Sequence, residues 1–422
     1  MKLNATYIKI RDKWWGLPLF LPSLILPIFA HINTFAHISS GEVFLFYLPL
    51  ALMISMMMFF SWAALPGITL GIFVRKYAEL GFYETLSLTA NFIIIIILCW
   101  GGYRVFTPRR NNVSHGDTRL ISQRIFWQIV FPATLFLILF QFAAFVGLLA
   151  SRENLVGVMP FNLGTLINYQ ALLVGNLIGV PLCYFIIRVV RNPFYLRSYY
   201  SQLKQQVDAK VTKKEFAIWL LALGALLLLL CMPLNEKSTI FSTNYTLSLL
   251  LPLMMWGAMR YGYKLISLLW AVVLMISIHS YQNYIPIYPG YTTQLTITSS
   301  SYLVFSFIVN YMAVLATRQR AVVRRIQRLA YVDPVVHLPN VRALNRALRD
   351  APWSALCYLR IPGMEMLVKN YGIMLRIQYK QKLSHWLSPL LEPGEDVYQL
   401  SGNDLALRLN TESHQERITE LD

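Results

Sequence analysis

Three polar side chains in the last quarter of the chain are of the types that bear on metal and phosphate chemistry. Asp404 offers a carboxylate, and Asn403 beside it offers an uncharged amide. Arg360 carries a fixed positive charge. Divalent ions that assist phosphoryl transfer are held mainly by carboxylates, whose negative charge neither an amide nor a guanidinium supplies. A site built from these three residues is therefore expected to bind a divalent metal poorly.

Two segments frame these residues. The first reads Leu329-Ala-Tyr-Val-Asp333-Pro-Val-Val-His-Leu338-Pro-Asn340-Val-Arg342, and the second reads Ser401-Gly402-Asn403-Asp404-Leu405. The first resembles the opening pattern Leu-Ala-x-x-Asp-x-Leu-Thr-Gly-Leu-x-Asn-Arg-Arg of GGDEF domains, with Val336 and His337 in place of Thr and Gly. The second, preceded by Val397 to Leu400, resembles their Gly-Gly-Asp-Glu-Phe hairpin. This resemblance implies a partial α/β domain of the nucleotide-cyclase type, the fold that joins two GTP molecules into cyclic-di-GMP.

The same resemblance implies that the catalytic chemistry is lost. Alignment on Gly363 and Gly372 places non-acidic side chains at the metal positions and aliphatic ones at the positions that read guanine. The lost metal positions are Arg360, Pro362 and Asn403, and the lost guanine positions are Val368 and Ile377. The product-inhibition motif would fall on Glu392 to Glu395 and lacks its arginine. We expect a catalytically inactive GGDEF domain, with no cofactor in this chain.

The composition places most of the chain in a membrane. Hydrophobic residues make up 56% of the 422 residues and charged residues only 14%, a balance not found in soluble domains of this length. Runs such as Phe126 to Ala150 reach the roughly 20 apolar residues that a helix needs to cross a bilayer. We predict a polytopic all-α bundle of ten spans, with eight as the alternative. The ten predicted spans are residues 14–33, 43–58, 62–78, 86–103, 125–148, 164–187, 216–233, 245–259, 265–282 and 301–317.

Basic residues predict the orientation of these spans. Lys and Arg concentrate at residues 2–13, 104–124, 188–214, 260–264 and from 318 onward. By the positive-inside rule these segments are cytoplasmic, so both chain ends face the cytoplasm. Residues 2–13 and 104–124 are then on the same side, so an even number of spans must lie between them. This requires Val43 to Val74 to cross the membrane twice, with a break near Phe59 to Trp62 or near Pro66-Gly67. The alternative is that one neighbouring segment is re-entrant. The same rule explains the net charge of +17 without nucleic acid, so the expected partner is the lipid bilayer.

Seven amide side chains fall inside the predicted spans: Asn91, Gln128, Gln141, Asn168, Gln170, Asn176 and Asn310. Such groups are costly in hydrocarbon unless they pair within the bundle or face a cavity. They are interpreted either as contacts between helices or as the lining of a ligand pocket. The four cysteines have no metal-ligand or CxxC spacing and are expected to be packing residues.

Residues 301–331 contain no Gly or Pro, so one helix can leave the membrane and continue beyond it. Leu315, Val322, Ile326 and Leu329 form a narrow apolar stripe suited to a two-stranded coil, which predicts a homodimer. The alternative is that the neighbouring arginines hold the helix at lipid headgroups while the stripe packs on its own chain. The expected organisation is a sensor at 1–317, a juxtamembrane helix at 318–328 and an incomplete GGDEF domain at 329–422.

A bundle of this kind before a GGDEF-like segment resembles the MASE-type sensors of enterobacterial inner-membrane cyclic-di-GMP phosphodiesterases. In these proteins an EAL domain hydrolyses cyclic-di-GMP with metal-bound water. The resemblance implies that the chain is truncated. The cyclic-di-GMP site, with Mg or Mn, would then belong to an EAL domain beyond residue 422, so the parent protein would be a hydrolase while this chain has no catalysis of its own. The alternatives are a membrane transporter and an active diguanylate cyclase.

Overall fold

A computed structural model describes residues 13–38, 41–107, 121–148, 162–208, 211–232, 245–285, 290–351, 354–360, 363–400 and 404–410. Pro362 and Ser401 to Asn403, which the sequence analysis singled out, lie outside these ranges. The chain divides into two compact units, Met1–Arg318 and Gln319–Asp422.

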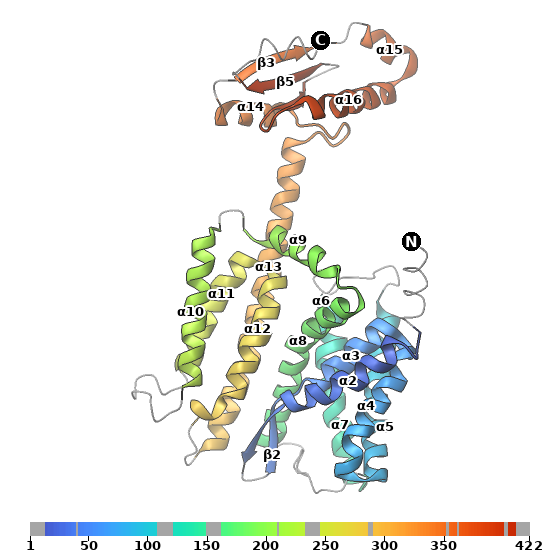
Figure 1. Ribbon diagram of the computed structural model, residues 1–422, viewed down its shortest axis with the longest axis vertical. Helices are drawn as coiled ribbons and strands as arrows, with labels where there is room; N and C mark the ends of the chain where they lie inside the picture. The colour runs from blue at the N-terminus through green and yellow to red at the C-terminus, as the bar shows by residue number, and fades with distance from the viewer. Residues whose placement is uncertain are drawn as a thin grey trace. The chain divides into compact units, whose positions relative to one another are not determined.

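The first unit is built mainly from helices (Figure 1). They are α2 (Leu17–Ile32), α3 (Pro49–Phe60), α4 (Leu65–Leu80), α5 (Phe82–Phe106), α6 (Ile121–Arg124), the π-helix η3 (Ile125–Val130), α7 (Phe131–Phe145), α8 (Leu163–Arg191), α9 (Tyr195–Gln206), α10 (Lys213–Cys231), α11 (Tyr245–Tyr261), α12 (Tyr263–His279) and α13 (Tyr291–Tyr331). The last of these runs on into the second unit as one continuous helix, as the absence of Gly and Pro predicts.

Among the described residues, six helical runs are long and apolar enough to cross a membrane. They are Pro49–Leu80, Phe82–Phe106, Ile125–Phe145, Leu163–Arg191, Lys213–Cys231 and Tyr291–Tyr331. The apolar helices α2 and α12 are shorter. The predicted helical membrane protein is confirmed at this level, whereas the count of ten or eight spans stays a prediction.

The prediction of an all-α bundle is wrong for one segment. Strands β1 (Thr34–Ile38) and β2 (Gly41–Phe46) pair antiparallel, where the sequence analysis expected a helical span to begin at residue 43. In β1 the side chains alternate, with Phe35 exposed and Ala36 buried. A short apolar run such as Val43 to Phe46 fits a buried strand as well as a helix, and periodicity alone does not separate the two.

A break interrupts the long run between Pro49 and Leu80, near the position expected from the sequence. α3 ends at Phe60, and Ser61 adopts a positive φ of 55°. The 3-10 turn η1 (Ser61–Ala64) follows, and α4 begins at Leu65. The break is therefore confirmed at Ser61. That the chain crosses the membrane once before this break and once after it stays a prediction.

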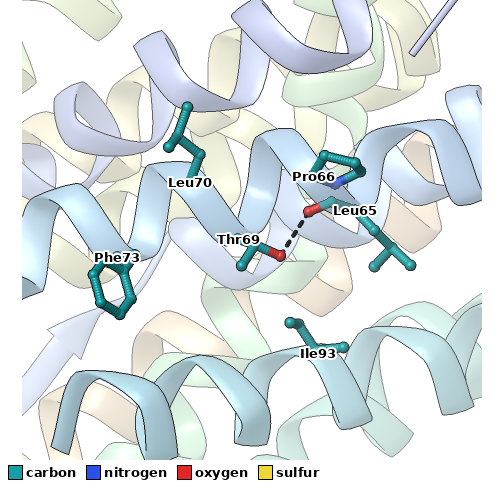
Figure 2. A pocket seen from close by; sticks show the side chains of 6 residues that line it. All are labelled: Leu65, Pro66, Thr69, Leu70, Phe73 and Ile93. Carbon is teal, nitrogen blue, oxygen red and sulfur yellow. Dashed lines mark hydrogen bonds between the residues drawn. The ribbon is translucent and has the colours of Figure 1, made fainter. Parts of the chain in front are cut away.

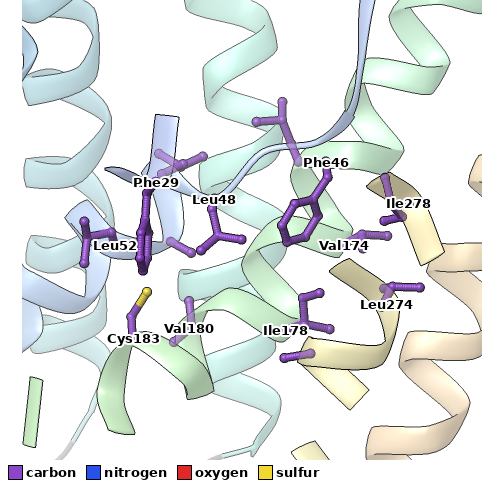
Figure 3. Packing of buried hydrophobic residues seen from close by; sticks show 14 of the residues in the cluster. Phe29, Phe46, Leu48, Leu52, Val174, Ile178, Val180, Cys183, Leu274 and Ile278 are labelled. Carbon is purple, nitrogen blue, oxygen red and sulfur yellow. The ribbon is translucent and has the colours of Figure 1, made fainter. Parts of the chain in front are cut away.

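Glycines set four residues apart bring helices of the first unit into close contact. A Cβ atom at Gly175 of α8 would lie 2.0 Å from the Tyr47 carbonyl oxygen, and one at Gly67 of α4 would lie 2.4 Å from the Pro18 carbonyl oxygen of α2. Gly179 and Gly71 follow one turn later on the same helix faces. Figure 3 shows the apolar side chains that fill the space around α8, including Leu48, Leu52, Val180 and Cys183.

The second unit contains a small mixed α/β arrangement. Its elements are α14 (Val341–Asp350), β3 (Ser354–Leu359), α15 (Met364–Tyr371), α16 (Ile373–Leu387), the 3-10 turn η6 (Ser388–Leu390), β4 (Asp396–Gln399) and β5 (Leu405–Asn410). The strands are antiparallel in the order β3-β5-β4. Val397, Leu405, Leu407 and Leu409 from the sheet pack with Leu387 of α16. This is an α/β unit of the predicted class, while its assignment as a GGDEF domain is not tested by the fold.

Candidate functional site

Two of the predicted site residues, Arg360 and Asp404, lie at the same end of the three-stranded sheet. Leu359, the last residue of β3, pairs with Leu405, the first residue of β5. Arg360 and Asp404 each lie one residue beyond this pair and therefore stand opposite one another. β4 and β5 form the predicted hairpin, with Gln399 paired to Leu405 and the Leu400 N–H donating to the Asp404 carbonyl oxygen at 3.2 Å. The register thus places a basic residue opposite an acidic one.

Tyr358 adds a group that the sequence analysis did not consider. Its hydroxyl donates a hydrogen bond to the Asp404 carboxylate, which stabilises the protonated phenol and raises the pKa of Tyr358. The positive charge of Arg360 opposes this shift. The Asp404 carboxylate therefore already has a partner within the protein. That partner is Tyr358 of β3, two residues before Arg360.

The two positions expected to have lost guanine recognition lie on separate helices. Val368 is half-buried in the last turn of α15, and Ile377 packs against the core of the second unit from α16. Neither side chain has a hydrogen-bonding atom. The two side chains contribute to packing, and the loss of guanine recognition at these positions stays a prediction.

A buried lysine is the other residue that the sequence analysis missed. Lys380 of α16 is only 1% exposed. Burial lowers its pKa, as does the nearby charge of Arg376, while Asp404 and Asp333 act in the opposite direction. The burial of Lys380 could have been predicted from its spacing. It follows the core residue Ile377 by three positions, so the two lie on the same face of α16. Among the described residues, no three His, Cys, Asp or Glu side chains are grouped closely enough to hold a metal ion.

The segment that resembles the start of a GGDEF domain has a structural role. The Asp333 carboxylate accepts hydrogen bonds from the Val335 and Val336 N–H groups at 2.8 and 3.0 Å. His337 then adopts a φ of +61°, at the position where the family pattern has glycine. Asn340 caps α14 by accepting from the N–H groups of Arg342 and Ala343 at 3.0 and 3.1 Å. These residues form a tight turn followed by a helix start.

Some of the seven amide side chains of the first unit join elements to one another. Asn168 accepts from the Phe44 N–H of β2 at 2.7 Å, Gln170 donates to the Ser300 hydroxyl of α13 at 2.7 Å, and Asn176 donates to the Ile129 carbonyl oxygen at 3.4 Å. Asn310 bonds within α13. Several amide atoms are buried with no hydrogen-bond partner among the described residues: Asn91 Nδ2, Gln128 Oε1, Gln141 Nε2, Gln170 Oε1, Asn176 Oδ1 and Asn310 Oδ1. Contacts between elements are thus observed for three of the seven.

One large groove lies between α4 and α5 (Figure 2). Its volume is about 530 Å³, and it is lined by Leu65, Pro66, Thr69, Leu70, Phe73 and Ile93. The hydroxyl of Thr69, the single polar group among these side chains, donates to the Leu65 carbonyl oxygen of its own helix at 2.8 Å. With no polar group left to orient a ligand, this groove has the character of a surface for lipid acyl chains.

The apolar stripe on α13 is exposed. Val322, Ile326 and Leu329 are 49%, 59% and 61% exposed, and Leu315 is 36% exposed. Pairing of the stripe with a second copy and packing of it on its own chain both stay predictions.

Together, the apolar helices and the small α/β unit define a membrane protein with a second, α/β unit. The chain belongs to the MASE1 family, whose sequence model matches residues 15–320. It is 99% identical over 422 residues to "Cyclic di-GMP phosphodiesterase PdeF" of Escherichia coli (strain K12), covering 100% of this chain and 56% of that protein. It is 25% identical over 408 residues to "Probable cyclic di-GMP phosphodiesterase PdeA" of the same organism, covering 94% of this chain and 54% of the relative. The chain thus spans little more than half the length of these relatives, and no solved structure matches it.

Proposed function

We propose that this chain is the membrane sensor and regulatory part of a cyclic-di-GMP signalling protein. The observation that carries the proposal is α13, a single helix of 41 residues that begins among the apolar helices and ends in the α/β unit. A helix without Gly or Pro transmits a shift or rotation at one end to the other, because its backbone hydrogen bonds are continuous. Membership of the MASE1 family and the names of the two relatives support the same signalling role.

The α/β unit is proposed to be a GGDEF domain without cyclase activity. Arg360 stands opposite Asp404, so a divalent ion placed between them would meet a fixed positive charge and one carboxylate that Tyr358 already engages. Val368 and Ile377 provide no contacts to guanine. A regulatory or dimerising role agrees better with these side chains than GTP condensation does.

Hydrolysis of cyclic-di-GMP is proposed for the longer protein to which this sequence corresponds. Both relatives carry that activity in their names, one of them as probable, and each is nearly twice as long as the matched region. The hydrolytic residues would then belong to an EAL domain outside these 422 residues, with Mg²⁺ or Mn²⁺ as cofactor. In this proposal these 422 residues regulate the hydrolysis of cyclic-di-GMP and do not catalyse it.

The proposed location is the bacterial inner membrane, with both described ends of the first unit on the cytoplasmic side. Two of the basic segments lie together, since the Asp208 N–H donates to the Arg260 carbonyl oxygen at 3.0 Å and the side chains of the same residues approach to 3.4 Å. Such clustering at one end of the helices is what the positive-inside rule requires. The exposed stripe Val322, Ile326 and Leu329 is the proposed homodimer contact.

Two assays test the proposal directly. The purified chain in lipid nanodiscs, incubated with GTP and Mg²⁺, should form no cyclic-di-GMP, and any enzymatic product would overturn the inactive-domain assignment. The longer protein should hydrolyse cyclic-di-GMP, and the same assay on this chain should show no hydrolysis. If the longer protein is inactive towards cyclic-di-GMP under all lipid conditions, the signalling assignment fails.

The role of α13 is tested by breaking it. Ala321→Pro removes a helical hydrogen bond and kinks the helix, whereas Ala321→Ser keeps it intact. In the longer protein we expect the proline variant, and not the serine variant, to lose the dependence of hydrolysis on the membrane part. Equal regulation in both variants would contradict transmission through α13.

A further inference from the structure

A small cavity lies in the first unit where α8, α9 and α12 meet. Its volume is about 40 Å³, and four tyrosines and two basic side chains contribute to its lining. They are Tyr184, Arg188, Tyr195, Tyr199, Tyr263 and Lys264. A cavity of this volume has room for roughly three water molecules, or for one phosphate group in their place.

Both basic side chains are half-buried, and their partners are neutral. The Arg188 guanidinium lies 5.4 Å from the Tyr195 ring centroid, with its Nη1 3.4 Å from the Tyr195 hydroxyl. The Lys264 ammonium donates to the Gln202 side-chain oxygen and lies 5.4 Å from the Tyr199 ring centroid. In the part of the chain that the structure describes, no carboxylate lies within 4.0 Å of either cation.

The acids near this end of the helices are committed elsewhere. Asp208 and Glu215 both approach Arg260, at 3.4 and 3.6 Å. A third positive charge, from the buried Arg124, acts electrostatically on Tyr184 and Tyr263, which line the cavity. The cavity therefore concentrates positive charge among hydroxyl donors, and an anion is the species that this arrangement stabilises.

The position of α9 indicates where the anion comes from. This helix exposes apolar side chains at Leu196 and Tyr200, 49% and 71% exposed, together with basic ones at Arg197 and Lys204. A short helix with exposed apolar and basic groups is suited to the boundary between headgroups and acyl chains. The cavity beside it is then at the depth of lipid phosphates.

We propose that this cavity binds the phosphate of an anionic lipid headgroup, with Arg188 and Lys264 as the charged ligands and the tyrosine hydroxyls as further donors. The bound phosphate would lie beside the contact between α12 and α13, because the backbone N–H of Tyr263 donates to the Thr317 hydroxyl at 3.0 Å. Lipid composition is thereby connected to the helix that leaves the membrane unit. This connection rests on the proposed signalling function, whereas phosphate binding itself does not.

The test is lipid binding by the full chain in nanodiscs. Native mass spectrometry should show phosphatidylglycerol retained in preference to phosphatidylcholine by the unmodified chain. Arg188→Gln and Lys264→Gln should each weaken this retention by about tenfold or more, because each removes a charge-assisted hydrogen bond. Arg197→Gln and Lys204→Gln remove the same charges from the exposed face of α9 and should have no comparable effect.

A second measurement separates the two sources of phosphate and guards against misfolding. Inorganic phosphate is titrated onto the chain in phosphatidylcholine nanodiscs. If the chain binds it and Lys264→Gln abolishes this binding, the cavity is a phosphate site, and its ligand is free phosphate. Arg188→Lys, which keeps the charge, should retain most of the lipid binding and shows that the fold tolerates substitution. If Arg188→Gln and Lys264→Gln bind lipid and phosphate as the unmodified chain does, the proposal is overturned. Neither readout involves cyclic-di-GMP, so this failure is distinct from failure of the proposed function.

Discussion

The backbone N–H of Tyr263, at the start of α12, donates a hydrogen bond to the side-chain hydroxyl of Thr317 on α13 at 3.0 Å. Further along the same pair of helices, the Trp270 indole N–H donates to the Ser306 hydroxyl at 3.0 Å. Hydrogen bonds across helices are specific in geometry, whereas apolar contacts in a lipid environment are not. These two bonds therefore hold α13 to α12 in a defined register.

Thr317→Val tests this register. The substitution keeps the shape of the side chain and removes its hydroxyl, leaving the Tyr263 N–H without its acceptor. We expect the free energy of unfolding to fall by about 1–2 kcal/mol, because a half-buried donor loses its partner. Thermal unfolding in detergent measures the change.

Thr69→Val is the matched control. The Thr69 hydroxyl donates to the carbonyl oxygen four residues earlier, as that of Thr317 does, but Thr69 faces the apolar groove of Figure 2. Its substitution should change stability by less than about 0.5 kcal/mol. Equal effects of the two variants would mean that the bond to Tyr263 does not hold the helices together.

Gly175→Ala is expected to disrupt the packing of α8. The added Cβ would lie 2.0 Å from the Tyr47 carbonyl oxygen, so backbone must move to admit it. Overpacking of this kind costs about 1–3 kcal/mol. Gly224→Ala, on α10, places a Cβ that meets nothing within 4 Å apart from its chain neighbours and the adjacent backbone of its own helix, and it should stabilise that helix slightly. Comparison of the two melting temperatures checks the prediction, and a Gly175→Ala chain as stable as the unmodified one would contradict it.

The broad class and most helices could be predicted from the sequence, because apolar runs of about 20 residues have few alternatives to a membrane helix. Charge parity indicated that the run from Val43 to Val74 is interrupted, and the break at Ser61 falls at the first of the two positions that the sequence analysis left open. The hairpin of β1 and β2 could not, since a run as short as Val43 to Phe46 carries no helical or strand period of its own. The four-residue spacing of Gly67 and Gly71, and of Gly175 and Gly179, was a readable signal of close helix packing that the sequence analysis left unused.

The candidate site was only partly predictable. The pairing of β4 with β5 agrees with the hairpin that the sequence analysis expected, whereas the facing positions of Arg360 and Asp404 were not predicted and depend on the register of β3 against β5. The bond from Tyr358 to Asp404 and the burial of Lys380 depend on how the sheet and α16 pack in three dimensions. Neither the loss of metal binding nor the loss of guanine recognition is tested by this geometry, so both stay predictions.

The bond between Tyr358 and Asp404 predicts a pH dependence. The pKa of Tyr358 is raised in the folded state, so the folded protein binds this proton more tightly than the unfolded chain does. The resulting stabilisation is fully present below the ordinary tyrosine pKa of about 10, and it is lost as pH rises through the raised value. Tyr358→Phe should therefore be less stable than the unmodified chain at pH 8 and lose that difference at strongly alkaline pH.

Asp404→Asn provides the control for that titration. The amide still accepts a hydrogen bond but no longer favours the protonated phenol through its charge. The pH-dependent part of the Tyr358 effect should then shrink in this background, as measured by unfolding at a series of pH values. A Tyr358 effect of unchanged size and pH dependence would show that Asp404 is not its cause.

His337→Gly is expected to stabilise the second unit. His337 holds a φ of +61°, which costs an L-residue about 1–2 kcal/mol relative to glycine. Glycine also loses more backbone entropy on folding, which offsets part of this gain and leaves a net increase of about 0.5–1 kcal/mol. His337→Ala separates backbone strain from side-chain contacts, because alanine keeps the strain and removes the imidazole. Hydrogen exchange of the β3 and β5 amides should slow in the glycine variant and not in the alanine variant; equal protection in both would show that the conformation at residue 337 is not strained.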